Sequence, residues 1–310
     1  MNIDLSILII SYNSRAETLA CLESVFRHPP LCSFEVIVLD NASSDGSAAA
    51  IAAAYPQLTL IRSDQNLGFA QGNNHAAIDA RGSRLLLLNP DTIVADTSLT
   101  ALWQCAEDNA SAGIWGGRTV FADGRLNPAS CWRDISLWSL CCSTFGLTWL
   151  RPESARFNPE AFGNWQRDTV RSVDIVSGCF LLIDHSLWRE LSGFDPCFFM
   201  YAEEADLCLR ARQRGAHPMI TPAATIIHLG GASETSQIEK VIKIHRGRIT
   251  LMRKHWPPVK LSVGLTLYWL WALLRMIAAY AVSGPRDGAG QSIKKWRTVW
   301  RQRHVWLGGY

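Results

Sequence analysis

The sequence lacks the short glycine-rich motifs that most often hold the phosphates of a nucleotide. The turn after the first apolar run reads Ser11-Tyr12-Asn13-Ser14-Arg15, which is not G-x-G-x-x-G, and no G-x-x-x-x-G-K-[ST] occurs anywhere in the chain. A dinucleotide fingerprint and a P-loop are therefore excluded. If the chain binds a nucleotide, it must do so with polar loops at several successive strand ends.

Cysteine pairs with metal or disulfide spacing are also missing. The nine cysteines show no framework spacing, and Cys141-Cys142 has no CxxC partner, so we expect neither disulfides nor a zinc site. No secretory signal peptide precedes Ser6–Ile10, an apolar run that already predicts a core strand. We therefore expect reduced, buried cysteines in a cytosolic protein.

The chain also lacks a large excess of charge of either sign. The formal net charge is only +3, which is too small to imply a nucleic-acid partner. Hydrophobic residues make up 48% of the 310 positions, so the chain can bury a sizeable core. That length allows one large α/β domain with an appendage, or two domains.

Apolar runs alternate with helical patterns through the first part of the chain. The expected elements are strand 5–10, helix 17–26, strand 35–39, helix 48–55, strand 58–62, a polar loop 66–74 that enters a helix, strand 85–88, helix 98–110 and strand 114–121. This alternation predicts a parallel sheet with right-handed crossovers.

The second part of the chain is less regular. Residues 131–164 are rich in aromatic side chains and give no clear pattern. The elements expected after them are a strand 173–183 interrupted at Ser177-Gly178, helix 205–213, strand 224–228 and helix 237–254.

Two acidic clusters follow apolar runs that are far apart in the sequence. Asn89-Pro90-Asp91 closes the run 85–88, and Glu203-Glu204 follows the run 198–201, which we expect to be a strand. Carboxylates at the carboxyl ends of strands lie at the rim where open α/β sheets bind ligands. Either cluster alone is often only a turn or a helix cap. Together they suggest a metal-binding carboxylate and a catalytic base in one shared crevice.

Other polar residues at strand ends could hold a nucleotide. Tyr12 is placed to stack on a base, or else to pack in the first turn. Asp40 and Asn41 could bind a ribose or a pyrimidine edge, although turn chemistry explains them equally well. The loop at 66–74 adds three further candidates for the base and ribose, namely Asn66, Gly68 and Asn73.

The acidic residues themselves suggest metal and base chemistry. Asp91 is a candidate ligand for Mg²⁺ or Mn²⁺, which are often held by one or two carboxylates plus substrate phosphates. The proximity of Glu203 and Glu204 raises the pKa of one of them, and this suits a general base worth about 10²–10⁴ in rate. His228 could complete the metal sphere, although a lone histidine at a strand end is more often structural.

The ordered set of these segments resembles the inverting family 2 glycosyltransferases with a GT-A fold. It is most similar to the rhamnosyltransferases and related transferases of bacterial surface polysaccharides. The likeness runs from Leu5 to about Gly231. Its segments are 6–14, 36–47, 66–70, 88–92, 177–180, 193–195 and 203–210. Each motif alone is weak, whereas their order and spacing are specific.

The pattern of residues 256–310 predicts a C-terminal helical, membrane-associating appendage. The resemblance, which ends before those residues, implies an α/β fold of GT-A type with a mostly parallel central sheet flanked by helices. It makes Glu204 the general base beside Glu203, and it makes Asp91 and His228 ligands of Mg²⁺ or Mn²⁺. The residues expected at the nucleotide sugar are Ser11, Tyr12, Asn13, Asp40, Asn41, Asn66, Gly68, Asn73, Asn89 and Asp91. One departure is that Asn89-Pro90-Asp91 carries a single carboxylate where the family has D-x-D, which weakens the case for tight metal binding.

The same resemblance implies the partners and the location. The donor is expected to be a dTDP- or UDP-sugar, with rhamnose as the expected sugar. The acceptor is expected to be a glycan or a polyprenyl-diphosphate-linked glycan at the cytoplasmic face of the bacterial inner membrane. Two alternatives stay open, namely a sugar nucleotidyltransferase and a non-catalytic membrane-associated scaffold of the same fold.

We expect residues 1–255 to form the GT-A domain, with a nucleotide-binding half at 1–120 and an acceptor half at 121–255. Residues 256–310 would then form apolar and basic C-terminal helices. The run 261–282 is long enough to span a bilayer, but Arg275 lies within it and argues against a simple span. We therefore expect helices that lie on the membrane, with a buried helix pair as the alternative.

Overall fold

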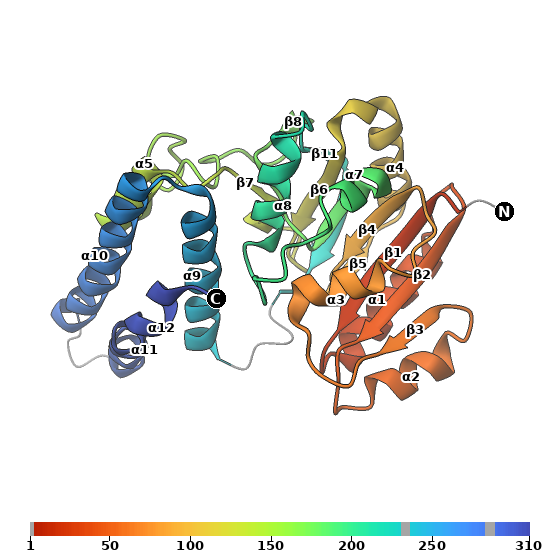
Figure 1. Cartoon of the computed structure of the whole chain (residues 1–310), viewed down its shortest axis with the longest axis horizontal. Helices are drawn as coiled ribbons and strands as arrows, with labels where there is room; N and C mark the ends of the chain where they lie inside the picture. Colours follow the sequence, from red (N-terminus) through yellow and green to blue (C-terminus); the bar gives the residue numbers. More distant parts are fainter. Residues whose placement is uncertain (1–2, 231–235, 283–288) are drawn as a thin grey trace. The chain divides into compact units, whose positions relative to one another are not determined.

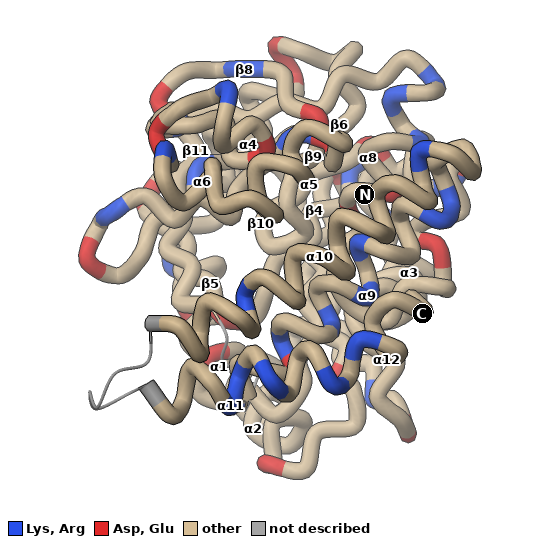
Figure 2. The backbone as a smooth tube through the Cα atoms, turned by 90° about the vertical axis from the view of Figure 1, so that its left-hand side faces the viewer, with Lys and Arg blue, Asp and Glu red and all other residues tan. Residues whose placement is uncertain are grey.

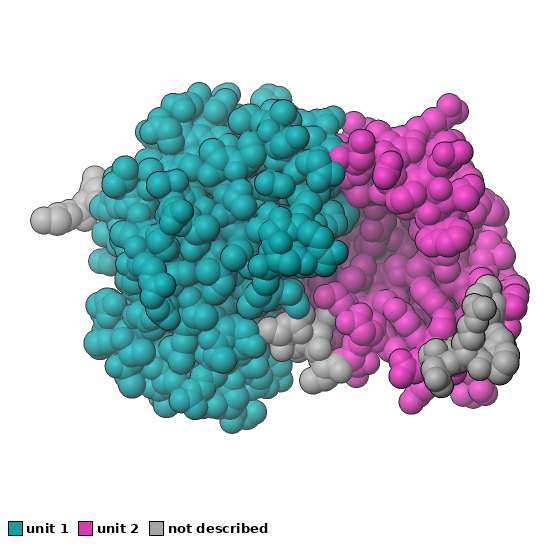
Figure 3. Space-filling view, turned by 180° about the vertical axis from the view of Figure 1, so that it is seen from behind, with its two compact units in different colours: residues 1–132, 165–199, 203–233 teal, residues 133–164, 200–202, 234–310 magenta. Residues whose placement is uncertain are grey.

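The computed structural model describes residues 3–230, 236–282 and 289–310 (Figure 1). The chain divides into two compact units, which Figure 3 shows in different colours. Unit 1 comprises residues 1–132, 165–199 and 203–233, and unit 2 comprises residues 133–164, 200–202 and 234–310. Unit 2 thus includes residues 234–255, which the sequence placed in the GT-A domain.

Unit 1 is built on a large mixed sheet. Its strands are β1 (Leu5–Ser11), β2 (Phe34–Asp40), β3 (Thr59–Arg62), β4 (Arg84–Leu88), β5 (Thr92–Val94), β6 (Ile114–Val120), β8 (Arg171–Ser172), β10 (Phe180–Asp184) and β11 (Met219–His228). The strand order is β3-β2-β1-β4-β10-β6-β11-β5, and β8 pairs with β11. Short strands β7 (Cys131–Trp132) and β9 (Ile175–Val176) form a second sheet.

Helices connect and cover these strands. Those of unit 1 are α1 (Arg15–Arg27), α2 (Ser47–Ala54), α3 (Gly68–Ala76), α4 (Ser98–Asp108), α7 (His185–Glu190) and α8 (Glu203–Arg212), with 3₁₀ turns at Ala110–Ala112 and Pro128–Ser130. The predicted alternation of strands and helices up to β4 is confirmed, and β1 to β4 are parallel to one another.

The strand registers bring the predicted polar residues to one edge of the sheet. Ser11 at the end of β1 lies opposite Asp40 at the end of β2, and Asp40 lies opposite Arg62 at the end of β3. β4 ends nearby at Leu88, where antiparallel β10 begins with Phe180 directly opposite. The carboxyl edge of the parallel strands therefore carries the loops at 12–14, 40–45 and 89–91.

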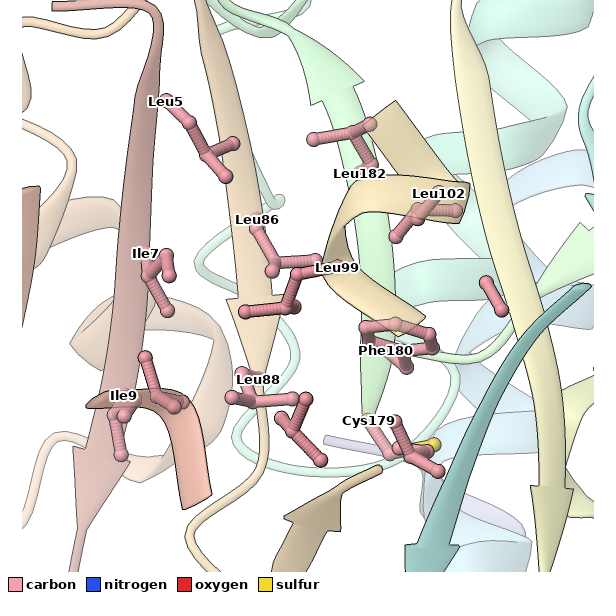
Figure 4. Close-up of a cluster of buried hydrophobic side chains, with 14 of the residues drawn as sticks. Leu5, Ile7, Ile9, Leu86, Leu88, Leu99, Leu102, Cys179, Phe180 and Leu182 are labelled. Carbon is pink, nitrogen blue, oxygen red and sulfur yellow. The ribbon is translucent and has the colours of Figure 1, made fainter. Parts of the chain in front are cut away.

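A continuous hydrophobic core fixes these strands in place. In Figure 4, Leu5, Ile7 and Ile9 of β1 lie beside Leu86 and Leu88 of β4. Residues of α4 and β10 complete this part of the cluster, namely Leu99, Leu102, Phe180 and Leu182. Because buried parallel strands are covered on both faces, they read as unbroken apolar runs, which is why the sequence pattern identified them.

Two expectations about strands are wrong. Residues 173–183 do not form one interrupted strand, because β9 pairs with β7 in the small sheet while β10 joins the main sheet. No strand is found at 198–201, so Glu203-Glu204 follows a turn and opens helix α8. Phe198 is fully buried, and this burial explains the apolar run without a strand.

Unit 2 is helical apart from its loops. Its helices are α5 (Leu137–Thr144), α6 (Leu147–Leu150), α9 (Gln237–His255), α10 (Pro258–Val282), α11 (Ala289–Arg301) and α12 (Arg303–Gly308). Residues 131–164, which showed no clear pattern, thus contribute α5 and α6. Helix α10 packs against α5, α9 and α11.

Helix α10 is long and apolar enough to cross a membrane by length and composition, and 22% of its most apolar window is buried. Its Arg275 donates a hydrogen bond to the carbonyl oxygen of Ser143 at 3.1 Å, and the Thr144 hydroxyl donates to the carbonyl of Leu267 at 3.1 Å. Helix α5 therefore provides one hydrogen bond to the charged group inside this helix.

Candidate active site

Asp91 and His228 are brought together by the pairing of two strands. β5 runs antiparallel to β11, and its first residue, Thr92, lies opposite His228. Asp91 therefore sits next to His228, with Nε2 of the histidine 3.3 Å from Oδ1 of the aspartate. The backbone N–H of Leu229 donates to the carbonyl of Asp91 at 3.0 Å and extends the pairing.

The two groups shift each other's protonation. Burial raises the pKa of Asp91, but the hydrogen bond and charge of His228 outweigh this effect and hold the pKa of that carboxyl below its usual range. Burial also disfavours a charged His228, yet the neighbouring Cys179 sulfur and Asp91 carboxylate raise the pKa of the imidazole to about 10. The pair is therefore a carboxylate beside a proton-bearing ring at neutral pH.

This pair would hold a divalent cation once Nε2 of His228 gives up its proton, because the protonated nitrogen has no lone pair for a metal. Two donors in adjacent positions of an octahedral ion lie about 3 Å apart when the bonds are about 2.1 Å, close to the 3.3 Å observed. Across the described ranges, no group of three or more His, Cys, Asp or Glu side chains is arranged to hold an ion. A cation at Asp91 and His228 would thus need oxygen atoms from a substrate to complete its sphere.

The acidic pair opens helix α8. Glu203 is 4% exposed, and burial together with the charge of Glu204 raises its pKa well above the usual value. Its Oε2 atom is buried and has no hydrogen-bond partner in the part of the chain that the structure describes. Farther along α8, Arg210 donates to Asp206 and to the carbonyls of Leu191 and Gly193, at 2.7–2.9 Å. These bonds anchor the helix that carries the acidic pair.

A glycine connects the acidic pair to the Asp91–His228 pair. A Cβ placed on Gly178 would lie 4.0 Å from Cβ of Glu204, at ordinary van der Waals distance, so the glycine faces that residue. The next residue, Cys179, accepts a hydrogen bond from the Asn89 N–H at its carbonyl, at 3.0 Å, and its sulfur is close enough to raise the pKa of His228. Residues 178–179 thus lie next to both predicted functional clusters.

The residues predicted to bind the nucleotide differ in how many of their polar atoms are already hydrogen-bonded within the protein. Tyr12 and Asn13 follow β1, and Asn13 binds the next loop through Ser43 and Ser44 at 2.8–3.0 Å. Asp40 is 4% exposed; one carboxylate oxygen accepts from the Ser43 N–H, and the other is buried without a partner among the described residues. An unpaired buried oxygen of this kind is a candidate acceptor for a hydrogen-bond donor on a ligand.

Several other candidates are occupied by internal hydrogen bonds. The Asn41 side chain donates to Asn66 Oδ1 at 3.0 Å and to the carbonyl of Gly68 at 3.1 Å, and it accepts from the Leu67 N–H at 2.7 Å. Asn73 is 1% exposed and donates to the carbonyl of Phe69. Ser11 is fully buried, and its hydroxyl pairs with that of Thr18 at 2.9 Å. In the structure these side chains shape the loops.

The sequence did not single out three residues that position this site. Cys179 bridges Asn89 and His228, and its only signal was its place after Ser177-Gly178. Asn127 donates to the carbonyl of His228 at 3.3 Å, and Phe199 accepts from the Phe69 N–H at 2.9 Å with its carbonyl. Neither of the last two residues lies in a motif that sequence patterns could identify.

Comparisons with known proteins identify the family of this chain. Residues 6–201 match the family described as Glycosyl transferase family 2. An N-acetylglucosaminyl-diphospho-decaprenol L-rhamnosyltransferase of Mycobacterium tuberculosis is 27% identical over 205 residues, which cover 62% of this chain and 66% of that protein. The Escherichia coli rhamnosyltransferase WbbL is 37% identical over 78 residues, which cover 25% of this chain and 29% of WbbL.

A solved structure is similar over almost the whole chain. It is the mannosyltransferase PcManGT from Pyrobaculum calidifontis, in complex with GDP-Man and Mn²⁺. The two share 18% sequence identity with a TM-score of 0.58, over 99% of this chain and 86% of that one. This likeness supports the predicted GT-A type fold. Taken together, the family match and the fold show that the chain belongs to glycosyl transferase family 2 and has the predicted α/β fold of GT-A type.

Proposed function

We propose that this protein is an inverting glycosyltransferase that uses Glu204 as its general base and the Asp91–His228 pair as its metal site. The observation that carries the proposal is that residues 178–179 face Glu204 on one side and are hydrogen-bonded to Asn89 beside Asp91 on the other. A base and a metal site must lie within the length of one sugar for direct displacement, and a two-residue link is short enough for that.

The proposed reaction is a single displacement in which one bond forms, one bond breaks and one proton is transferred. The Glu204 carboxylate accepts the proton of an acceptor hydroxyl, and the acceptor oxygen forms a bond to the anomeric carbon. The bond from that carbon to the diphosphate oxygen breaks on the opposite face, so the anomeric centre inverts. The nucleoside diphosphate leaves with the electron pair. Burial keeps Glu203 protonated to higher pH. Because the two carboxyls are coupled, Glu204 is then the member of the pair that carries the negative charge.

The nucleotide lies across the carboxyl edge of β1, β2 and β4 in this proposal. Tyr12 stacks on the base, and the unpaired Asp40 oxygen accepts a hydrogen bond from the base or ribose. Asn41 and Asn66 hold the loop in shape for that contact. A divalent cation, Mg²⁺ or Mn²⁺, when bound by Asp91 and His228, would stabilise the negative charge of the leaving diphosphate.

The donor and acceptor are proposed by likeness to named relatives. A rhamnosyltransferase of decaprenol-linked N-acetylglucosamine and a second rhamnosyltransferase are among the similar proteins. We propose a dTDP- or UDP-sugar donor, rhamnose as the sugar and a polyprenyl-diphosphate-linked glycan as acceptor. Residues 1–120 would serve the donor and 121–255 the acceptor.

A lipid-linked acceptor requires access to a membrane. Unit 2 exposes several large apolar side chains, namely Trp138, Phe145, Trp149, Leu150, Val259, Val263, Trp269, Ile277 and Tyr280. Lysine and arginine residues lie along α9 and α11 of the same unit (Figure 2). Apolar and basic side chains together favour binding to anionic lipid, so we propose peripheral attachment at the cytoplasmic face of the inner membrane, through residues 256–310 and α6.

The Glu204→Gln variant tests the proposed base. Transfer should fall by at least about 10²-fold, because the neutral amide cannot accept the proton, while donor affinity measured by calorimetry should stay within about twofold. Glu239→Gln is the matched control, because Glu239 also lies in the first turn of a helix. Near-normal turnover by Glu204→Gln would show that another residue is the base.

A panel of nucleotide sugars tests the donor. The bound donor should raise the melting temperature only when Mn²⁺ or Mg²⁺ is present, because a ligand of the folded form stabilises it. Release of pyrophosphate from a nucleoside triphosphate would instead identify a nucleotidyltransferase. Absence of both donor binding and turnover would favour the scaffold.

A further inference from the structure

The three residues before the acidic pair have an unusual backbone. Tyr201 and Ala202 have φ angles of 72° and 73°, a left-handed conformation that residues with a side chain seldom adopt. Such a conformation persists only when surrounding contacts enforce it. Residues 200–202 belong to unit 2, whereas the residues on either side of them, Phe199 and Glu203, belong to unit 1.

Helix α9 supplies the first enforcing contact. Gly247 packs against Tyr201 so closely that a Cβ on the glycine would collide with the Tyr201 carbonyl oxygen and approach the Ala202 side chain at 3.3 Å. Gly247 is buried in the middle of α9, where glycine disfavours the helix. The close approach to Tyr201 gives this glycine a packing role.

Residues after α12 supply the second contact. The Tyr310 hydroxyl donates a hydrogen bond to the carbonyl oxygen of Met200 at 2.8 Å. This segment is itself fixed on one face of α9, because Thr250 Oγ1 accepts from the Tyr310 N–H at 2.8 Å and Arg246 donates to the Gly309 carbonyl at 3.1 Å. Arg246 also lies 4.4 Å from the centre of the Tyr310 ring.

A third bond strengthens the same attachment. Arg253 donates to the carbonyl of Leu307 at 2.9 Å, so positions 246, 250 and 253 of α9 all hold the segment 307–310. Residues spaced three and four apart lie on one face of a helix. Gly247 lies next to that face and carries the contact to Tyr201, so α9 connects the segment 307–310 with the backbone at 200–202.

We propose that Tyr310 and Gly247 form a clamp on residues 200–202 that positions the acidic pair Glu203-Glu204 for base catalysis. The inference rests on the proposed function of Glu204. Tyr310 is a positioning residue: it acts through the covalent chain, because the backbone it holds leads directly into the first residue of α8.

The Tyr310→Phe variant removes only the hydroxyl of this clamp. We expect amide hydrogen exchange to rise at least about threefold in the peptide 200–206, and kcat to fall at least about threefold with the donor KM unchanged, because small displacements of a catalytic group are costly. The acidic limb of the kcat–pH profile should also move, since a buried carboxyl titrates according to its surroundings. Tyr280→Phe is the matched control, because Tyr280 is 51% exposed on α10 of the same unit.

A second pair of variants tests the other half of the clamp. Gly247→Ala should produce the same changes as Tyr310→Phe, whereas Gly290→Ala, at a helical glycine with nothing within 4 Å of the added Cβ, should produce none. The proposal is overturned if Tyr310→Phe leaves exchange at 200–206 unchanged, or if exchange rises while kcat and its pH profile stay at wild-type values. If the wild-type protein transfers no sugar, the proposed function fails, and the exchange measurement alone decides whether the clamp exists.

Discussion

The Nε2 atom of His228 lies 3.3 Å from Oδ1 of Asp91, and the register of β5 against β11 places the two residues side by side. Asn127 holds the carbonyl of His228, and Thr92 holds the carbonyl of Asn89 at 2.7 Å. The donor atoms are therefore positioned by backbone pairing before any ligand arrives. Such preorganisation reduces the cost of assembling a metal site.

The Asp91→Asn variant should weaken Mn²⁺-dependent binding of a nucleoside diphosphate at least about tenfold, because it replaces the carboxylate donor with a neutral amide. Calorimetric titration of UDP and dTDP, with and without Mn²⁺, measures this loss. Asp123→Asn is the control, since Asp123 pairs with Arg125 in an exposed turn. Unchanged metal dependence in Asp91→Asn would exclude this residue from the metal site.

The Glu203→Gln variant should change how stability depends on pH. Burial and the charge of Glu204 raise the pKa of Glu203 in the folded protein, so the unfolded state loses this proton first as pH rises. The wild type thus loses stability as pH rises from the usual pKa of a glutamate to the raised value, and the loss persists above it. We expect the variant to melt at least about 2 °C higher at pH 8, roughly the shift for 1 kcal/mol in a domain of this size.

The same difference in melting temperature should vanish near pH 4, where Glu203 is protonated in both the folded and the unfolded state. Scanning calorimetry at several pH values measures it. A difference that is constant across this range would mean that Glu203 is not the group whose pKa is raised.

Asn41 and Asn66 should act as one unit in stability. Asn41→Ala leaves the Leu67 N–H without its partner and removes one of the two hydrogen bonds that Asn66 Oδ1 accepts, the other coming from the Gly68 N–H, so we expect a loss of about 1–3 kcal/mol. A double-mutant cycle with Asn66→Ala in urea should give a coupling energy of at least about 0.5 kcal/mol. Additive losses would show that the two side chains do not stabilise the loop together.

Trp149 should contribute to membrane binding. Its side chain is 80% exposed on the short helix α6, and burying such a ring in the lipid interface is favourable. Trp149→Ala should bind vesicles of phosphatidylcholine with 30 mol% phosphatidylglycerol at least about threefold more weakly than the wild type in a sedimentation assay. Leu31→Ala, at a residue 88% exposed in unit 1, should bind as the wild type does. Equal binding by all three proteins would argue against α6 as an anchor.

The sequence predicted the parallel part of the sheet well because β1, β2 and β4 are buried on both faces and read as unbroken apolar runs. It could not predict the placement of β10 between β4 and β6, because strand order depends on contacts between distant segments. β5 escaped notice because it is a strand of only three residues, Thr92–Val94. Without β5, nothing in the pattern reveals why Asp91 lies beside His228.

The region before the acidic pair shows that one sequence pattern can arise from two different structures. The run 198–201 is apolar because Phe198 is buried in unit 1, and a short apolar run does not distinguish a strand from a packed turn. Similarly, asparagine is common both in ligand sites and in loop-shaping hydrogen bonds. Asn41 is of a residue type that often binds ligands, but in the structure its side chain forms hydrogen bonds with neighbouring loop residues.

Gly178 has a consequence for comparing related sequences. A Cβ at this position would lie 2.9 Å from the Phe69 ring, too close for an unperturbed contact, and 4.0 Å from Cβ of Glu204. A related sequence with a larger residue there would have to displace the phenylalanine ring or the backbone beside Glu204. We therefore expect glycine at position 178 in relatives that use the proposed base.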